Sequence, residues 1–270
     1  MAIEWRDLTP EIASQVSGSA EELLVPEAAA RLRRLLVARG VLIFRELGLS
    51  DEQQVRLAGL MGNVRAEGER GIFKITLDTD LNAKAEYLRG SFLWHMDGTH
   101  DDVPVFASLL TGRTLSHEGG QTLFANSYAA YEALSPEMKA RLEGLRVTHS
   151  FETSMIRAGV EPSEANVAYW RSIPDKTHSL VWGHASGRKS LVIGCHASHV
   201  VGMDRAESDA LLAELLAWVT QPRFTYRHEW TPGDLLIWDN TGVLHRAEPY
   251  PFDSGREMHR TTLLGEEAFA

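Results

Sequence analysis

The sequence predicts a mainly β fold with flanking helices, built around a double-stranded β-helix (jelly-roll) core. Short segments rich in β-branched and aromatic residues recur through the chain, bounded by Gly, Pro, Asn or Asp. They are too many and too closely spaced for a parallel sheet, which needs a crossover helix between successive strands. An antiparallel roll closed on one side by helices fits this pattern. The predicted strands are residues 105–112, 121–126, 145–151, 178–183, 190–194, 223–230, 234–240 and 260–265.

Helix signals are strongest near the start of the chain. Pro26 suits a first helical turn, leucines follow at helical spacing, and Gly40 marks the end. This helix is expected to run directly into a strand at residues 41–45. A second helix is expected after Ser50, because Gln53 completes a capping box with it.

Two further helices are expected between the strands. One surrounds the Ser-Pro-Glu sequence at 135–137, and the other begins at Asp204, with Glu207 three residues later and leucines at 211, 212, 215 and 216. No repeat, low-complexity tract or linker interrupts the chain. We therefore expect one domain over residues 1–270, with N-terminal helices over about 1–62 and the roll over about 90–270.

Composition limits the classes of partner. The chain has 27 Lys and Arg against 37 Asp and Glu, and its net charge of −10 repels polyanions, so no nucleic acid partner is expected. The apolar runs are far shorter than the ~20 residues of a membrane helix, and the N-terminus lacks a signal-peptide pattern. No membrane partner and a cytoplasmic location are therefore predicted. The single cysteine, Cys195, fits a reducing compartment and is expected to be a small buried side chain.

Three residues predict a metal site. In FLWHMDGTH, residues 92–100, a strand would point His95 and Asp97 to one face, and His245 follows His95 by 150 positions. Two imidazoles and one carboxylate can occupy one face of an octahedral metal, leaving three positions open for an organic cosubstrate and oxygen. The H-x-D pattern alone also occurs by chance, and the same ligands suit zinc.

The block around His245 strengthens this prediction. A PGD turn precedes a strand, WDN ends it, and Arg256 and Arg260 follow His245 at offsets of 11 and 15 residues. The chain resembles the taurine dioxygenase and 2,4-dichlorophenoxyacetate dioxygenase superfamily (TauD/TfdA-like) of iron(II)- and 2-oxoglutarate-dependent oxygenases, and GRKSL followed by HASHVVGM is similar to its aryloxyalkanoate branch. The segments that carry the resemblance, between residues 93 and 265, are LWHMD, GGQTLFAN, GRKSL, HASHVVGM, WDNTGVLHRAEPY and GREMHRTTLLG.

The resemblance implies a role for each matching residue. His95, Asp97 and His245 would bind Fe(II). Arg256 would clamp the distal carboxylate of 2-oxoglutarate, and Thr122 would hydrogen-bond the same carboxylate. With O2, such an enzyme hydroxylates a substrate C–H bond and releases succinate and CO2, and a C–O bond breaks where the hydroxylated carbon carries an ether oxygen. Relatives are commonly dimers or higher, so a homo-oligomer, a dimer or tetramer, is expected.

Arg260 is predicted to bind the substrate. On a strand, positions 256, 258 and 260 share a face, so both arginines would point into the roll, where two buried guanidinium groups need two anions. The first anion is the cosubstrate, and the second would be a carboxylate or sulfonate of the substrate. Alternatively, Arg260 supports the first carboxylate or pairs with a structural acid such as Asp239. The two arginines could also exchange roles.

The expected substrate pocket departs from that of the taurine enzyme. Ser91 stands where that enzyme has an asparagine, and residues 62–75 lack its histidine and tyrosine. Taurine is therefore not the expected substrate. Ser91 and Leu93, with Phe92 and the 74–91 stretch, are expected to line a pocket for a bulkier, less polar acid of the aryloxyalkanoate type. A sulfonate, an alkyl sulfate or a natural product is the alternative.

Several other polar residues are expected to be structural. His100 has the opposite strand parity from Asp97, so a loop or supporting role is predicted for it. The run EGERG at 67–71 is expected to be a solvated loop, with a lid as the alternative. Satisfied polar roles, with substrate contacts as the alternative, are expected for His196, His199 and His259.

Two other functions use the same triad. A zinc hydrolase would leave Arg256 and Thr122 without an evident task, and a non-catalytic module that binds a small acid would not need an intact triad.

Overall fold

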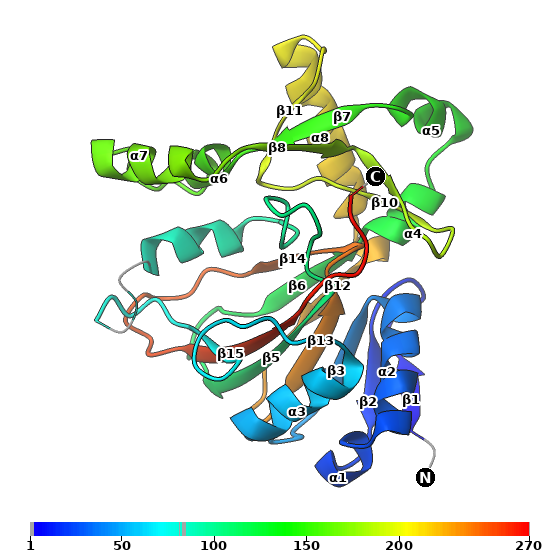
Figure 1. Ribbon diagram of the computed structural model, residues 1–270, viewed down its shortest axis with the longest axis vertical. Helices are drawn as coiled ribbons and strands as arrows, with labels where there is room; N and C mark the ends of the chain where they lie inside the picture. Colours follow the sequence, from blue (N-terminus) through cyan, green and yellow to red (C-terminus); the bar gives the residue numbers. More distant parts are fainter. Residues whose placement is uncertain (1–2, 81, 83–84, 270) are drawn as a thin grey trace.

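The largest element is a seven-stranded sheet (Figure 1) in a computed structural model that describes residues 3–80, 82 and 85–269. Its strand order is β1-β2-β3-β13-β5-β15-β4. All neighbours pair antiparallel except β2 and β3, which are parallel. The strands are β1 (Glu4–Asp7), β2 (Ser14–Ser17), β3 (Val41–Phe44), β4 (Phe73–Ile75), β5 (Ala107–Thr114), β13 (Leu235–Asp239) and β15 (Glu257–Leu263).

A smaller antiparallel sheet packs against the inner face of the large one. It has the order β12-β6-β14. Phe124 and Val243 from this sheet share one buried cluster with Trp238 and Met258 from the large sheet. The two sheets therefore lie face to face. The strands of the smaller sheet are β6 (Thr122–Asn126), β12 (Thr225–His228) and β14 (Val243–Ala247).

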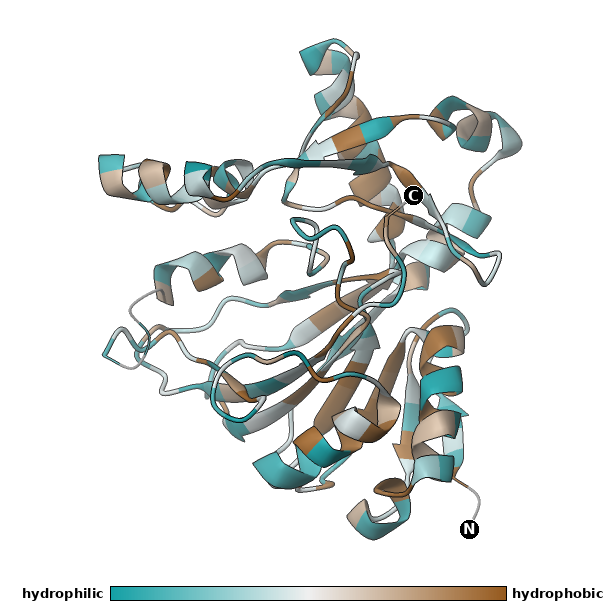
Figure 2. Cartoon of the chain, viewed as in Figure 1, coloured by the Kyte–Doolittle hydropathy of each residue, from teal (hydrophilic) through white to brown (hydrophobic). Residues whose placement is uncertain are grey.

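Two helices, α2 (Pro26–Arg39) and α3 (Asp51–Met61), cover the outer face of the seven-stranded sheet (Figure 1). The alternation of side chains along a strand explains this layering. Leu235 and Ile237 of β13 belong to the cluster that contains the helix residues, whereas Leu236 belongs to the cluster between the sheets. Figure 2 shows hydrophobic residues concentrated along these strands.

The chain between β6 and β12 covers the outer face of the smaller sheet. Ala125 and Leu244 of that sheet share a buried cluster with Leu211 and Leu215 of α8. No helix within the described ranges is both long and apolar enough to cross a membrane. The elements of this region are α4 (Ser127–Glu132), α5 (Pro136–Leu142), β7 (Arg146–His149), α6 (Phe151–Arg157), α7 (Glu164–Ser172), β8 (Lys176–Ser179), β9 (Val181–Gly183), β10 (Lys189–Leu191), β11 (Ala197–Val200), α8 (Arg205–Val219) and η2 (Pro222–Phe224).

The four predicted helices are present, and the predicted strand segment at 41–45 and those from residue 105 onward each overlap an observed strand. The capping box of Ser50 and Gln53 is confirmed. The expectation of a mainly β chain is too narrow, because the described residues form a mixed α/β fold with four sheets. Short helices such as α1 (Ala20–Leu23), α4, α6, α7 and the 3-10 helix η1 (Ala85–Phe92) were not expected, since segments this short carry no clear apolar stripe.

Candidate metal and cosubstrate site

His95 and His245 are brought together by one isolated β-bridge. The backbone N–H of His95 donates to the carbonyl of His245 at 3.0 Å, and the N–H of His245 donates back at 2.9 Å. The two rings then lie with their centroids 4.1 Å apart. Because His245 belongs to β14 and His95 follows η1, the tertiary fold joins two segments that are distant in sequence.

The expectation of a strand through His95 and Asp97 is wrong. Only His95 forms a bridge, and residues 97–100 turn away. The turn needs Gly98, which has φ +84° and whose added Cβ would lie 2.9 Å from the Cα of Pro104. Asp97 reaches the histidines because the turn directs it there, and not through strand alternation.

The three side chains surround one point. One carboxylate oxygen of Asp97 lies 3.7 Å from Nε2 of His95, and the other lies 3.7 Å from Nε2 of His245. One ligand atom from each residue lies within 4.8 Å of the others. Ligand atoms about 2.1 Å from a shared ion lie roughly 3 to 4 Å apart, so the group can close on a metal. Nδ1 of His95 lies 2.8 Å from the carbonyl of Leu93, which fixes the ring with Nε2 towards the site.

Electrostatics favour the metal-binding forms of these groups. Burial, followed by the charge of His95, lowers the pKa of His245 to about 3, so its imidazole is neutral at pH 7. Burial raises the pKa of Asp97, but the charges of His245, Arg260 and His95 together outweigh it and hold the pKa at about 2. Neutral imidazole and ionised carboxylate are the forms that bind metal ions.

Arg256 is a buried cation without a carboxylate partner among the described residues. It is 4% exposed, its Nη2 donates to the carbonyl of Gly120 at 3.1 Å, and its guanidinium lies 4.5 Å from the ring centroid of Tyr250. Burial lowers the pKa of Arg256, and contact with Tyr250 opposes that effect. Gly120 has φ +78°, and a Cβ there would lie 2.9 Å from Nε of Arg256. The Gly-Gly sequence before Thr122 therefore leaves room for this guanidinium.

Thr122 begins the strand two residues after Gly120. Its side chain is buried, and Oγ1 accepts a hydrogen bond from Nε1–H of Trp230 at 3.0 Å. The hydroxyl hydrogen of Thr122 has no acceptor among the residues that the structure describes, so it is available for an anion. Arg256 thus packs on Gly120, two residues before Thr122, and both the guanidinium and the hydroxyl are buried.

Arg260 lies between two carboxylates. Its Nη1 is 3.6 Å from Oδ2 of Asp97, and its Nε is 3.7 Å from Oε1 of Glu67. The alternative was that Arg260 pairs with a structural acid such as Asp239, and the acid beside it is Glu67 instead. Asp239 accepts hydrogen bonds from the backbone and hydroxyl of Thr241. The expectation of a shared strand face for both arginines is also wrong, since β15 begins only at Glu257 and its pairing with β5 shifts register directly after that residue.

The expected solvated loop at 67–71 is wrong for its first residue. The Glu67 side chain is only 17% exposed and accepts a hydrogen bond from the hydroxyl of Thr262 at 2.5 Å. A charged Glu-Gly-Glu-Arg run carries no sequence signal for burial. The contact exists because the hairpin of residues 64–72 folds against β15.

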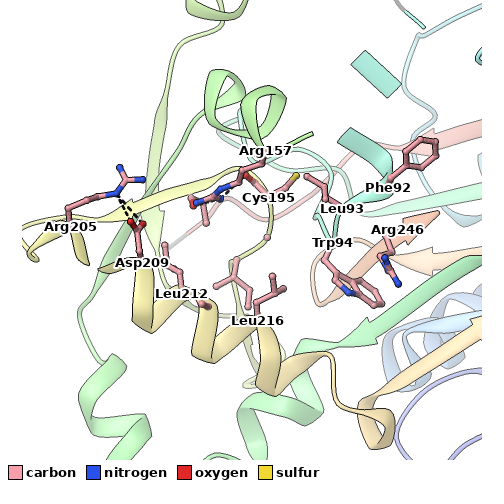
Figure 3. A pocket seen from close by; sticks show the side chains of 14 residues that line it. Phe92, Leu93, Trp94, Arg157, Cys195, Arg205, Asp209, Leu212, Leu216 and Arg246 are labelled. Atoms are coloured by element: carbon pink, nitrogen blue, oxygen red, sulfur yellow. Dashed lines mark hydrogen bonds and ion pairs between the residues drawn. The ribbon is translucent and has the colours of Figure 1, made fainter. Parts of the chain in front are cut away.

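Ser91 and Leu93, the other two residues predicted to contact the substrate, lie just before His95 in the chain. The Ser91 hydroxyl donates to the carbonyl of Leu88 at 2.6 Å within η1. Leu93 and Trp94 lie opposite Leu212 and Leu216 of α8 (Figure 3), in a cavity of about 610 Å³ that none of the three candidate metal ligands lines. Substrate contacts of Ser91 and Leu93 stay predictions, and residues 81, 83 and 84 of the expected 74–91 lining lie outside the described residues.

The expected satisfied histidines differ in their contacts. His259 lies between Asp51 and Glu257, at 2.7 and 2.8 Å, as expected for a structural residue. Nδ1 of His199 lies 3.3 Å from the hydroxyl of Ser198.

A cluster of four histidines, two buried and two half-buried, lies next to the site and carries no signal in the sequence. The rings of His100 and His196 lie 5.0 Å apart, and those of His149 and His178 lie 5.5 Å apart. His149 is fully buried, and neither of its ring nitrogens has a hydrogen-bond partner within the described part of the chain. Only the pairing of β7 with β8 places His149 and His178 together, and no motif in the sequence indicates it.

Two imidazoles and one carboxylate around one point fit a metal-dependent oxygenase, and comparison with known proteins shows the class to be that of 2-oxoglutarate-dependent dioxygenases, which are oxidoreductases. The family model described as "Taurine catabolism dioxygenase TauD, TfdA family" matches residues 4–262. The chain belongs to this family.

Three relatives show the likeness in more detail. The alpha-ketoglutarate-dependent 2,4-dichlorophenoxyacetate dioxygenase of Burkholderia sp. (strain RASC) is 35% identical over 98% of this chain and 95% of its own. The alkylsulfatase of Acinetobacter baylyi is 31% identical over 98% of this chain and 86% of its own. A crystal structure of AAD-2 in complex with Mn(II) and N-oxalylglycine has a TM-score of 0.86 at 32% identity and covers all of both chains.

Proposed function

We propose that this protein is an Fe(II)- and 2-oxoglutarate-dependent dioxygenase that hydroxylates a C–H bond of a small, anionic and fairly apolar substrate of the aryloxyalkanoate type. Succinate and CO2 are the co-products, and a C–O bond breaks where the hydroxylated carbon carries an ether oxygen. The observation that carries the proposal is the buried Arg256, which faces no carboxylate within the described residues, in a chain that also holds a triad that can close on a metal. An unpaired buried cation is costly unless a ligand pairs with it.

Each side chain has one task in this proposal. His95, Asp97 and His245 would hold Fe(II), which when bound supplies the oxygen chemistry. Arg256 would bind the distal carboxylate of 2-oxoglutarate through two N–H donors, and Thr122 would donate its free hydroxyl hydrogen to the same group.

The division of labour between the two arginines follows from their surroundings. Arg256 is buried without an acid, which suits a permanent anionic cosubstrate. Arg260 already lies near Asp97, whose charge a metal would take up, so it is the better candidate for the acid of the substrate. Its partial exposure, 23% of the side chain, also suits a group that substrates reach from solvent.

The architecture and assembly complete the proposal. We propose that the two facing sheets are the two halves of a double-stranded β-helix, because the chain crosses from one sheet to the other between β5 and β6 and again between β13 and β14. The whole chain would act as one domain and assemble as a dimer or tetramer.

The alternative is a sulfonate or alkyl sulfate as substrate. The guanidinium of Arg260 would bind either anion, and the similarity to an alkylsulfatase supports this alternative. Succinate release, measured with Fe(II), ascorbate, 2-oxoglutarate and a panel of aryloxyalkanoates, alkyl sulfates and sulfonates, tests the proposal and separates the two substrate classes. Asp97→Ala is the matched inactive control. Hydrolysis of a panel member without 2-oxoglutarate would contradict the proposal and favour a zinc hydrolase, and binding of the acids without turnover would favour a non-catalytic module.

A further inference from the structure

The hairpin of residues 64–72 holds Glu67 beside Arg260. Val64 forms a bridge with Leu263, and the N–H of Arg65 donates to the carbonyl of Thr262 at 2.8 Å. Beyond Glu67, the chain reverses at Gly68, which has φ +60° and where a Cβ would lie 1.9 Å from the carbonyl oxygen of Ile72. Only glycine fits there. The backbone therefore presents the Glu67 side chain to β15.

The contacts of Glu67 leave it ready to accept another hydrogen bond. Oε1 accepts from the hydroxyl of Thr262, and Arg260 lies 3.7 Å away, beyond hydrogen-bond distance. Nε of Arg260 is buried and has no hydrogen-bond partner among the described residues. The end of the site next to Asp97 thus contains a donor and an acceptor whose capacity is unused.

The charges of this pair set a condition on the substrate. Once a metal takes up the charge of Asp97, Arg260 and Glu67 remain as one fixed positive and one fixed negative group. A carboxylate bound to Arg260 would lie near the carboxylate of Glu67. Glu67 would only repel a substrate carboxylate that has an ether oxygen next to it. A substrate with an N–H, O–H or ammonium group next to its carboxylate could donate a hydrogen bond to Glu67.

We propose that Glu67 is a specificity-determining residue that selects acids carrying a hydrogen-bond donor next to the carboxylate, such as amino acids and arylamino acids, over simple ether acids. This inference rests on the proposed function, because it takes Arg260 as the site for the acid of the substrate. It narrows that function by replacing the ether oxygen of an aryloxyalkanoate with an N–H or O–H group as the preferred neighbour of the carboxylate. Arg260 binds the carboxylate, and Glu67 accepts a hydrogen bond from the neighbouring donor. Thr262 positions the Glu67 carboxyl.

A pair of nearly isosteric probes tests the proposal. N-phenylglycine carries an N–H where phenoxyacetate carries an ether oxygen. Their Kd values are measured by calorimetry on protein loaded with Mn(II) and 2-oxoglutarate in the wild type, in Glu67→Gln, and in Thr262→Val, which keeps the acid but removes its hydrogen-bond partner. Wild type is expected to bind N-phenylglycine about tenfold or more tightly than phenoxyacetate, which corresponds to one charged hydrogen bond. Glu67→Gln removes the charge but keeps an amide oxygen that accepts a neutral hydrogen bond, so it is expected to reduce that ratio towards one, and Thr262→Val to reduce it less.

Each other outcome contradicts the inference. Equal binding of both probes by wild type, or a ratio that Glu67→Gln does not change, would show that Glu67 does not contribute to substrate selectivity. An equal gain in affinity for both probes in Glu67→Gln would make Glu67 a general repeller of anions. Failure of the proposed function has a separate signature, because it would abolish the binding of 2-oxoglutarate to the Mn(II)-loaded protein before either probe is added. If 2-oxoglutarate binds and neither probe does, the inference alone is overturned.

Discussion

Replacing Arg256 with Gln tests the cosubstrate site most directly. The substitution keeps an amide that can donate to the carbonyl of Gly120, now 3.1 Å from Nη2, but removes the buried positive charge. Two charge-assisted hydrogen bonds of about 1.5–3 kcal/mol each would be lost to a bound carboxylate. We therefore expect 2-oxoglutarate binding to weaken by about 3–6 kcal/mol, which raises its Kd roughly 10²- to 10⁴-fold.

A keto acid that lacks the distal carboxylate isolates the contact of Arg256 with that group. 2-Oxopentanoate carries a methyl group in place of the distal carboxylate of 2-oxoglutarate. In calorimetric titrations of Mn(II)-loaded protein, it should bind wild type about as weakly as 2-oxoglutarate binds Arg256→Gln. It should lose little further affinity in the variant, because the contact is already absent. Equal loss of affinity for both keto acids in Arg256→Gln would refute the assignment and point to Arg260 as the cosubstrate residue.

Three other substitutions test the surroundings. Gly120→Ala should destabilise the fold by about 1–3 kcal/mol and weaken 2-oxoglutarate binding, because the site has φ +78° and the added Cβ would crowd the buried guanidinium; in chemical unfolding, the exposed helical Gly59→Ala, with nothing within 4 Å of its Cβ, is the control and should be neutral or stabilising. Thr122→Val should raise the Kd of 2-oxoglutarate about tenfold, while Thr122→Ser stays near wild type; no change in Thr122→Val would remove the hydroxyl from the site. Burial lowers the pKa of His149 from 6.5 to about 3, so the unfolded chain binds a proton that the folded chain does not, and stability falls as pH drops below 6.5. His149→Leu should therefore gain about 2 kcal/mol relative to wild type between pH 7 and pH 5 in urea unfolding, whereas the exposed His117→Gln should not, and parallel pH profiles for His149→Leu and wild type would contradict this account.

The sequence by itself determined the elements with strong local patterns and the chemical groups of the site. The helix at Pro26–Arg39, the capping box at Ser50 and the continuous apolar strand at Leu235–Asp239 are specified by neighbouring residues, so they could be predicted. His95, Asp97 and His245 were recognisable as metal ligands from their residue types and spacing, and the resemblance to a known family pointed to Arg256.

Only the tertiary structure decided how those groups meet. The bridge between His95 and His245 and the turn at Gly98 place the triad, where a continuous strand had been expected. The partners of Arg260 also come from distant segments. Glu67 belongs to a run expected to be a solvated loop, and the hairpin of residues 64–72 places it against β15. Local patterns report the environment of neighbours along the chain, whereas the position of a charge in a pocket depends on contacts between distant residues, which composition and spacing do not encode.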